Sequence, residues 1–173
     1  MTDTPPADSN DGPAAQAPAS QPPQVRVLGQ YIKDLSFENP NAPSGFSSQA
    51  PQINVSVDVR VPSQRGTDYE VELKLAADAR IGDTQAFLVE LVYGAVFRLE
   101  NIPEQSLQAI LLIECPRILF PFARRIIADM TRDGGFPPLM IDPIDFAALY
   151  RQRMAMAEAE SGGGAGAPAQ GNA

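Results

Sequence analysis

Four stretches of this chain alternate apolar and polar residues with a period of two, and this pattern limits the fold more than any other feature. The clearest stretch runs from Ile53 to Val61, where β-branched residues occupy all five odd positions. The other three stretches are residues 25–38, 69–75 and 86–99. Because successive side chains of a strand point to opposite faces, this alternation predicts strands with one covered face and one solvated face. Such strands are typical of an antiparallel sheet.

The odd or even number of a residue, which we call its parity, predicts whether its side chain faces the core. In the first strand the predicted inward residues are the odd ones, with Leu28 and Ile32 as exceptions: Val25, Val27, Tyr31, Leu35 and Phe37. The connection between the second and third strands spans residues 62–68, and Gly82 and Asp83 form a tight turn before the fourth strand. Residues 39–52 form a loop that is too long for a hairpin turn, and loops of this length tend to be functional.

The second half of the chain has helical periodicity. Apolar residues recur at helical spacing from Leu107 to Met130 and extend well round the helix, so a second subunit is expected to cover part of it. Pro116 and Pro121 are expected to kink or break this helix. A second helix is expected to start at Asp142 as the N-cap, with Pro143 in its first turn. Strands followed by helices predict an oligomeric α+β domain: a four-stranded antiparallel sheet with two helices packed on one face.

Composition divides the chain into one domain and two tails. Residues 1–23 are acidic and Pro-rich and residues 159–173 are Gly/Ala-rich, so we expect both to be disordered around a single domain at 24–158. The N-terminus lacks the apolar run of a signal peptide, and we expect no membrane span. The single cysteine, Cys115, excludes an intrachain disulfide and suits a reducing cytoplasm. We expect it to be a buried, inert thiol.

Net charge and the absence of histidine argue against several classes of function. The net charge of −8 disfavours binding to nucleic acid or anionic lipid. The chain has no histidine, which removes the commonest general base and transition-metal ligand. We therefore expect no enzyme activity, no cofactor and no metal site, and any source of energy would belong to a partner.

Two motifs carry a family resemblance. Residues 34–43 read DLSFENPNAP and residues 115–124 read CPRILFPFAR. Together they resemble the SecB family of bacterial protein-export chaperones. The resemblance implies a cytosolic, ATP-independent chaperone that binds unfolded secretory precursors and delivers them to the SecA motor ATPase. It also implies a homotetramer, built as a dimer of dimers.

The outward face of the sheet has two interpretations. Its carboxylates occupy even positions and could form an ordinary solvated face or a docking surface for a basic partner: Asp34, Glu38, Asp58, Glu70, Glu72 and Glu90. The family resemblance implies that Asp34, Glu38, Leu88 and Glu90 contact SecA. It further implies that the inward residues Val89, Leu91 and Tyr93 of the fourth strand affect assembly.

Aromatic and apolar residues near the loops also have two interpretations. They could be core residues at the ends of loops, or they could line a groove for unfolded clients, because Met and aromatic side chains suit promiscuous apolar binding: Phe46, Phe136, Leu139, Met140, Ile141, Phe146 and Tyr150. The resemblance implies the client groove. Two other classes of function stay open, namely an α+β ligand-binding or catalytic domain and a structural adaptor with no preference for unfolded clients.

Overall fold

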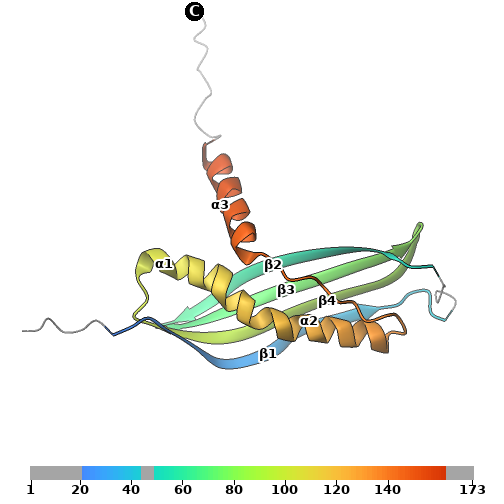
Figure 1. Cartoon of the computed structure of the whole chain (residues 1–173), viewed down its shortest axis with the longest axis horizontal. Coiled ribbons are helices and arrows are strands. Elements are labelled where there is room, and N and C mark those ends of the chain that lie inside the picture. The colour runs from blue at the N-terminus through green and yellow to red at the C-terminus, as the bar shows by residue number, and fades with distance from the viewer. Residues whose placement is uncertain (1–20, 44–48, 163–173) are drawn as a thin grey trace, which may run out of the picture.

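The structure is a computed structural model that describes residues 21–43 and 49–162. Four antiparallel strands form one sheet (Figure 1): β1 (Gln24–Glu38), β2 (Gln52–Arg65), β3 (Asp68–Ile81) and β4 (Thr84–Glu100). Their order is β1-β4-β3-β2, so β1 and β2 are the edge strands. The predicted antiparallel sheet is confirmed, and the long loop after β1 connects its two edges.

Both hairpins turn on two residues. Gly82 and Asp83 join β3 to β4 as predicted, and Gly66 and Thr67 join β2 to β3. The two glycines have φ angles of 58° and 60°, which L side chains rarely adopt and which tight hairpin turns need. The expected connection over residues 62–68 was therefore too long. β2 continues through Pro62, which an edge strand tolerates, with a register shift between Arg60 and Ser63.

Two β-bulges in β1 reverse which residues face the helices, odd or even, in the segment between them. Register shifts lie between Ile32 and Asp34 and between Val27 and Gly29. Each bulge adds one residue, so every side chain beyond it changes face. Tyr31 consequently pairs with Gly94 and lies on the face away from the helices, which corrects the inward position expected from its odd number. A Cβ at position 94 would lie 2.9 Å from the Tyr31 ring, so this close approach requires glycine.

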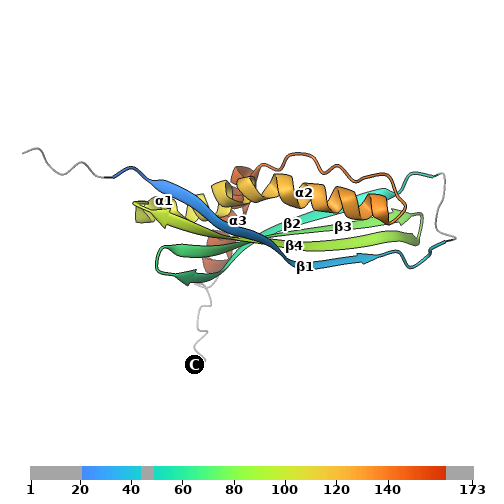
Figure 2. The same cartoon turned by 90° about the horizontal axis from the view of Figure 1, so that it is seen from below.

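A single helical rod covers the other face of the sheet (Figures 1 and 2). It consists of α1 (Glu104–Ala109), the π-helical turn η1 (Ile110–Glu114) and α2 (Cys115–Asp133). The Cys115 N–H reaches the Ile110 carbonyl five residues back, immediately before Pro116. A proline ring clashes with the carbonyl four residues earlier, and the wider turn removes that clash. The α-helix is thus interrupted by a π turn just before Pro116, where the sequence predicted a kink or break, whereas it continues without interruption through Pro121.

The core lies between α2 and the odd-numbered side of β3 and β4. Phe87, Phe97 and Leu73 are fully buried there with Leu119 and Ile127 of α2. Even-numbered residues of β3 and β4 are partly covered or exposed, apart from the buried Ala86 and Gly94 of β4. The predicted inward and outward faces of these two strands are confirmed.

The rod from Glu104 to Asp133 has the length and composition of a membrane-spanning helix, with a mean hydropathy of 1.4 in its most apolar window. This corrects the expectation that no segment would meet that criterion. Burial accounts for part of the apolar content, because one side of the rod forms the core described above.

The last helix, α3 (Phe146–Gly162), crosses the β2 edge (Figure 2). Its N-cap is Asp145, whose Oδ1 accepts the Ala148 N–H at 2.9 Å. The N-cap therefore lies three residues after the expected one, Asp142. Phe146 packs edge-on against Phe120 in the helix layer, at 6.1 Å between centroids. Two turns later, Arg153 donates to the Val59 carbonyl at 2.8 Å and pairs with Asp58 on the opposite face.

The two helical elements differ in where they lie relative to the sheet. α2 lies on the sheet face as predicted, whereas α3 runs past its edge (Figure 1). α3 also extends to Gly162, into the segment 159–173 that was predicted to be a disordered tail. The remainder of that tail, and most of the predicted tail 1–23, lie outside the described residues.

Candidate functional site

The outer face of the sheet, defined as the face opposite α2, brings the four predicted partner-binding residues together. Strand pairing places Glu38 opposite Leu88, Ser36 opposite Glu90, and Asp34 opposite Val92. These pairs form three neighbouring rows at the end of the sheet near the β3–β4 turn. We call Asp34, Glu38, Leu88 and Glu90 the acidic patch.

Charge on the outer face is compensated unevenly. Lys33 pairs with Glu70 and Glu72, Lys74 pairs with Glu90 at 3.3 Å, and Arg60 and Arg153 pair with Asp58. Asp34 and Glu38 are exposed and form no ion pair with any residue in the described part of the chain. Uncompensated negative charge is therefore concentrated in the acidic patch, a distinction that parity alone did not predict.

Glu70 belongs to a different environment on the same face. It accepts hydrogen bonds from the Tyr31 hydroxyl at 2.6 Å, Lys33 Nζ at 2.9 Å and Ser63 Oγ at 2.8 Å. These bonds, that of Tyr31 first, lower the pKa of Glu70 to about 2. Burial, together with the bond to Glu70, raises the pKa of Tyr31 to about 12. This carboxylate is engaged within the sheet and is not available to an incoming cation.

An apolar groove of about 420 Å³ lies at the β2 edge on the helix side of the sheet. The predicted residues Leu139, Met140 and Ile141 line it from one side, and the odd side chains of β2 line it from the other. The complete lining is Ile53, Val55, Val57, Leu139, Met140, Ile141, Asp142 and Ile144. The β2 residues were not among the predicted groove residues, although their odd positions on an edge strand could have indicated them.

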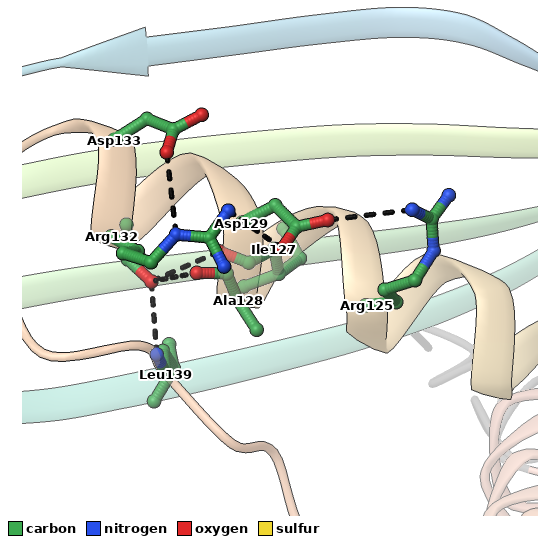
Figure 3. A network of polar contacts seen from close by, with 8 residues as sticks. Arg125, Ile127, Ala128, Asp129, Arg132, Asp133 and Leu139 are labelled. Atoms are coloured by element: carbon green, nitrogen blue, oxygen red, sulfur yellow. Dashed lines mark hydrogen bonds and ion pairs between the residues drawn. The ribbon is translucent and has the colours of Figure 1, made fainter.

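Thr131 fixes the segment that forms one wall of this groove, and Figure 3 labels its partners Ile127, Ala128 and Leu139. Its buried hydroxyl lies 3.0 Å from the Ile127 carbonyl and 3.1 Å from that of Ala128, and it accepts the Leu139 N–H at 2.9 Å. The Phe136 N–H also bonds to the Thr131 carbonyl. The segment after α2 therefore folds back along the helix instead of leaving it.

The other predicted groove residues lie elsewhere. Phe136 packs on Phe87 at 4.9 Å between ring centroids, and the Tyr150 hydroxyl donates to Gln108 at 3.3 Å. Phe146 is 1% exposed, so it belongs to the core rather than to an accessible wall. Phe46 lies outside the described residues.

The structure places the predicted oligomer-interface residues beneath α2 of the same chain, and their role in assembly stays a prediction. Val89 and Leu91 are 0% exposed, and Tyr93 is 8% exposed beneath Phe122 of α2, with 6.4 Å between ring centroids. A side chain covered within its own chain cannot contact a second copy directly. Any effect of these residues on assembly would pass through the position of α2.

The cysteine and the possible metal ligands are further functional groups of the described residues. Burial, and secondarily the charge of Glu114, raises the pKa of Cys115 to about 12, and the thiol is buried as predicted. Within residues 21–43 and 49–162, no three His, Cys, Asp or Glu side chains are grouped to hold a metal ion.

Comparison with known proteins identifies the family. The profile of the family described as "Preprotein translocase subunit SecB" matches residues 18–157. A protein-export protein SecB of Parvibaculum lavamentivorans is 59% identical over 149 residues, covering 84% of this chain and 89% of that protein. The chain belongs to the SecB family. Another SecB, from Hyphomonas neptunium, is 56% identical over 155 residues, covering 88% of this chain and 90% of that protein.

A solved structure supports the fold of this SecB-family chain. It is a SecB-like chaperone of Mycobacterium tuberculosis in complex with a ChAD peptide from the HigA1 antitoxin. It superposes with a TM-score of 0.59 at 14% identity, covering 69% of this chain and 90% of that one. The family assignment made from residues 34–43 and 115–124 is confirmed, as is the α+β fold.

Proposed function

We propose that this protein is a cytoplasmic, ATP-independent chaperone that holds unfolded precursor proteins and delivers them to the SecA motor ATPase. One observation carries the proposal: an open apolar groove and the acidic patch, in which Asp34 and Glu38 form no ion pair with the described residues, occupy different sides of the same sheet. A client in the groove leaves the acidic patch free. Holding a client and docking on a motor can then occur together.

The groove suits an unfolded client because its apolar side chains are accessible. Met140 is 58% exposed and Val55 is 41% exposed. Fully burying one apolar side chain contributes roughly 1.5–3 kcal/mol. Micromolar affinity requires about 8 kcal/mol after the costs of ordering, so several client side chains must bind at once. A folded protein offers no such accessible run of apolar residues.

Assembly would extend this surface. We propose a homotetramer arranged as a dimer of dimers, in which grooves of several copies bind one long client. Supporting this, apolar side chains of the β1 edge and of α2 remain exposed in the single chain: Val25, Val27, Ile32, Ile118 and Phe122. Multivalent contact with one client raises overall affinity without new kinds of contact.

Calorimetry with one polypeptide in two states tests client binding. A permanently unfolded form, obtained by reduction and alkylation of a disulfide-containing protein, is expected to bind, and its native form is not. Met140→Asp should weaken binding of the unfolded form, whereas Met156→Asp, which places the same charge on an exposed site of α3 outside this groove, should change it less. Equal affinity for the native and unfolded forms would support the structural adaptor instead.

Charge substitutions test the docking surface. Asp34→Asn and Glu38→Gln are expected to weaken SecA binding and to leave client binding unchanged, with the loss decreasing at high salt as exposed charges are screened. Glu100→Gln is the matched control, since it removes one charge at the far end of β4 on the same face. Leu88→Ala should weaken SecA binding at any salt concentration. The acidic patch is excluded as the docking surface if Glu100→Gln weakens SecA binding as much as Asp34→Asn.

A further inference from the structure

Lys74 is a cation of the outer face that pairs with a carboxylate of the acidic patch, Glu90. Strand pairing puts Asp34, Val92, Lys74 and Asp58 in one row across all four strands of the outer face. Side chains directly opposite each other on neighbouring strands are closer than diagonal ones. Asp58 is directly opposite Lys74, whereas Glu90 is diagonal to it. Even so, the Lys74 ammonium pairs with Glu90, at 3.3 Å.

Lys74 pairs with Glu90 because two arginines already bind the nearer carboxylate, Asp58. Its carboxylate already binds Arg60, through Nε at 2.7 Å, and Arg153, which reaches it from α3. Burial tends to raise the pKa of Asp58, but the bonds and charges of the two arginines outweigh burial and lower it. A third cation at Asp58 would meet two like charges. Lys74 instead reaches diagonally to Glu90 on β4.

We propose that Lys74 restrains the affinity of the acidic patch for a basic partner by neutralising Glu90, and that Arg153 keeps Lys74 there by occupying Asp58. This inference rests on the proposed function, in which Glu90 contacts SecA. When α3 leaves the β2 edge, Lys74 can turn to Asp58, and Glu90 becomes available. The docking of α3 and the binding of the motor therefore oppose each other. Such coupling is reciprocal, so bound SecA also favours release of α3.

Three variants test the inference by SecA affinity at low salt. Lys74→Met keeps the apolar stem and removes the charge, and it is expected to bind SecA about twofold to fivefold more tightly, the range for one exposed ion pair. Arg153→Met should also tighten binding. In the Lys74→Met background, Arg153→Met should add nothing, because its effect acts through Lys74.

Lys33→Met is the matched control. It makes the same charge change on the same face, but Lys33 pairs with Glu70 and Glu72 and not with the acidic patch. The role of Lys74 is overturned if Lys33→Met tightens binding as much as Lys74→Met. The role of Arg153 is overturned if its substitution acts equally with and without Lys74. Far-ultraviolet circular dichroism establishes that each variant is folded.

A parent protein that fails to bind SecA contradicts the proposed partner. The same variants are then compared with an arginine-rich peptide as the probe. The inference stands only if the peptide follows the same order, with Lys74→Met above Lys33→Met and no added effect of Arg153→Met. A peptide that binds all variants equally overturns it.

Discussion

At the scale of single residues, Glu70 shows how one carboxylate can join three strands. Tyr31 from β1, Ser63 from β2 and Lys33 from β1 converge on this β3 side chain. The β1 bulge makes this possible, because it turns Tyr31 to the outer face. The cluster links both edge strands to the centre of the sheet on a face that no helix covers.

This cluster predicts an acid-dependent loss of stability. The folded pKa of Glu70 is about 2, below its ordinary value of 4.5. Its contribution is therefore fully present above about pH 4.5 and is lost as the pH falls towards 2. We expect the free energy of unfolding, measured by urea denaturation, to fall less between those pH values in Glu70→Gln than in the parent.

Tyr31→Phe provides a second variant for the same measurement. It removes the hydrogen bond that lowers the pKa of Glu70 most, so its dependence on pH should lie between those of the parent and Glu70→Gln. If the three proteins lose stability in parallel, the Glu70 cluster does not contribute to acid sensitivity.

At the scale of elements, the sequence predicted the inward and outward faces of β3 and β4 well, since both are central strands whose alternation reports burial directly, although β3 runs to Ile81, beyond the predicted residues 69–75. The edge strands were harder. The bulges of β1 depend on how Tyr31 packs on Gly94, and the length of β2 depends on an edge position that tolerates Pro62. The alternation within one strand predicts neither the bulges of β1 nor the length of β2, because both depend on neighbouring strands.

The candidate site was predictable to a similar degree. Parity and family resemblance together located the acidic patch. They did not identify Lys74 or Arg153, because the pairing of each depends on side chains that are distant in sequence. They also placed Phe146 in the groove, whereas the capping of α3 by Asp145 directs it into the core.

The segment after α2 gives a prediction at this scale. Thr131→Val replaces the hydroxyl by a methyl group and leaves the Leu139 N–H without its acceptor. An unpaired buried group costs about 1–3 kcal/mol, and because the Leu139 N–H is only partly buried we expect a loss of unfolding free energy near the lower end of that range. We also expect weaker client binding, because Leu139 and its neighbours form one wall of the groove.

Thr131→Ser retains the hydroxyl and serves as the control. It should keep client affinity near that of the parent, at some cost in stability from the lost methyl group. If calorimetry gives the same client affinity for Thr131→Val and Thr131→Ser, the hydroxyl does not position the groove wall.

At the scale of the whole molecule, a single chain leaves apolar surface uncovered along β1 and α2. Phe122 is 45% exposed although it stacks on the buried Tyr93. We predict that multi-angle light scattering will give four times the mass of one chain, and that Phe122→Asp will shift the population to smaller species. Met156→Asp, at a comparably exposed site on α3, should keep the parent mass.

A charge in the core should behave differently. Leu91→Asp is expected to unfold the chain instead of dissociating a folded assembly, because Leu91 is fully buried beneath α2. Circular dichroism separates the two outcomes. A folded Leu91→Asp variant of reduced mass would indicate that β4 contributes to assembly more directly than its burial suggests.

The burial of Cys115 has a practical consequence for studying this protein in motion. Its thiol is enclosed, and its pKa of about 12 keeps it protonated at neutral pH, so maleimide reagents should pass it by. The native chain can therefore serve as a background for site-specific labelling without removing its cysteine. Two dyes, one at Met156→Cys on α3 and one at Asn54→Cys on β2, would turn the separation of helix and strand edge into a fluorescence signal. Energy transfer between them could then follow α3 while SecA binds.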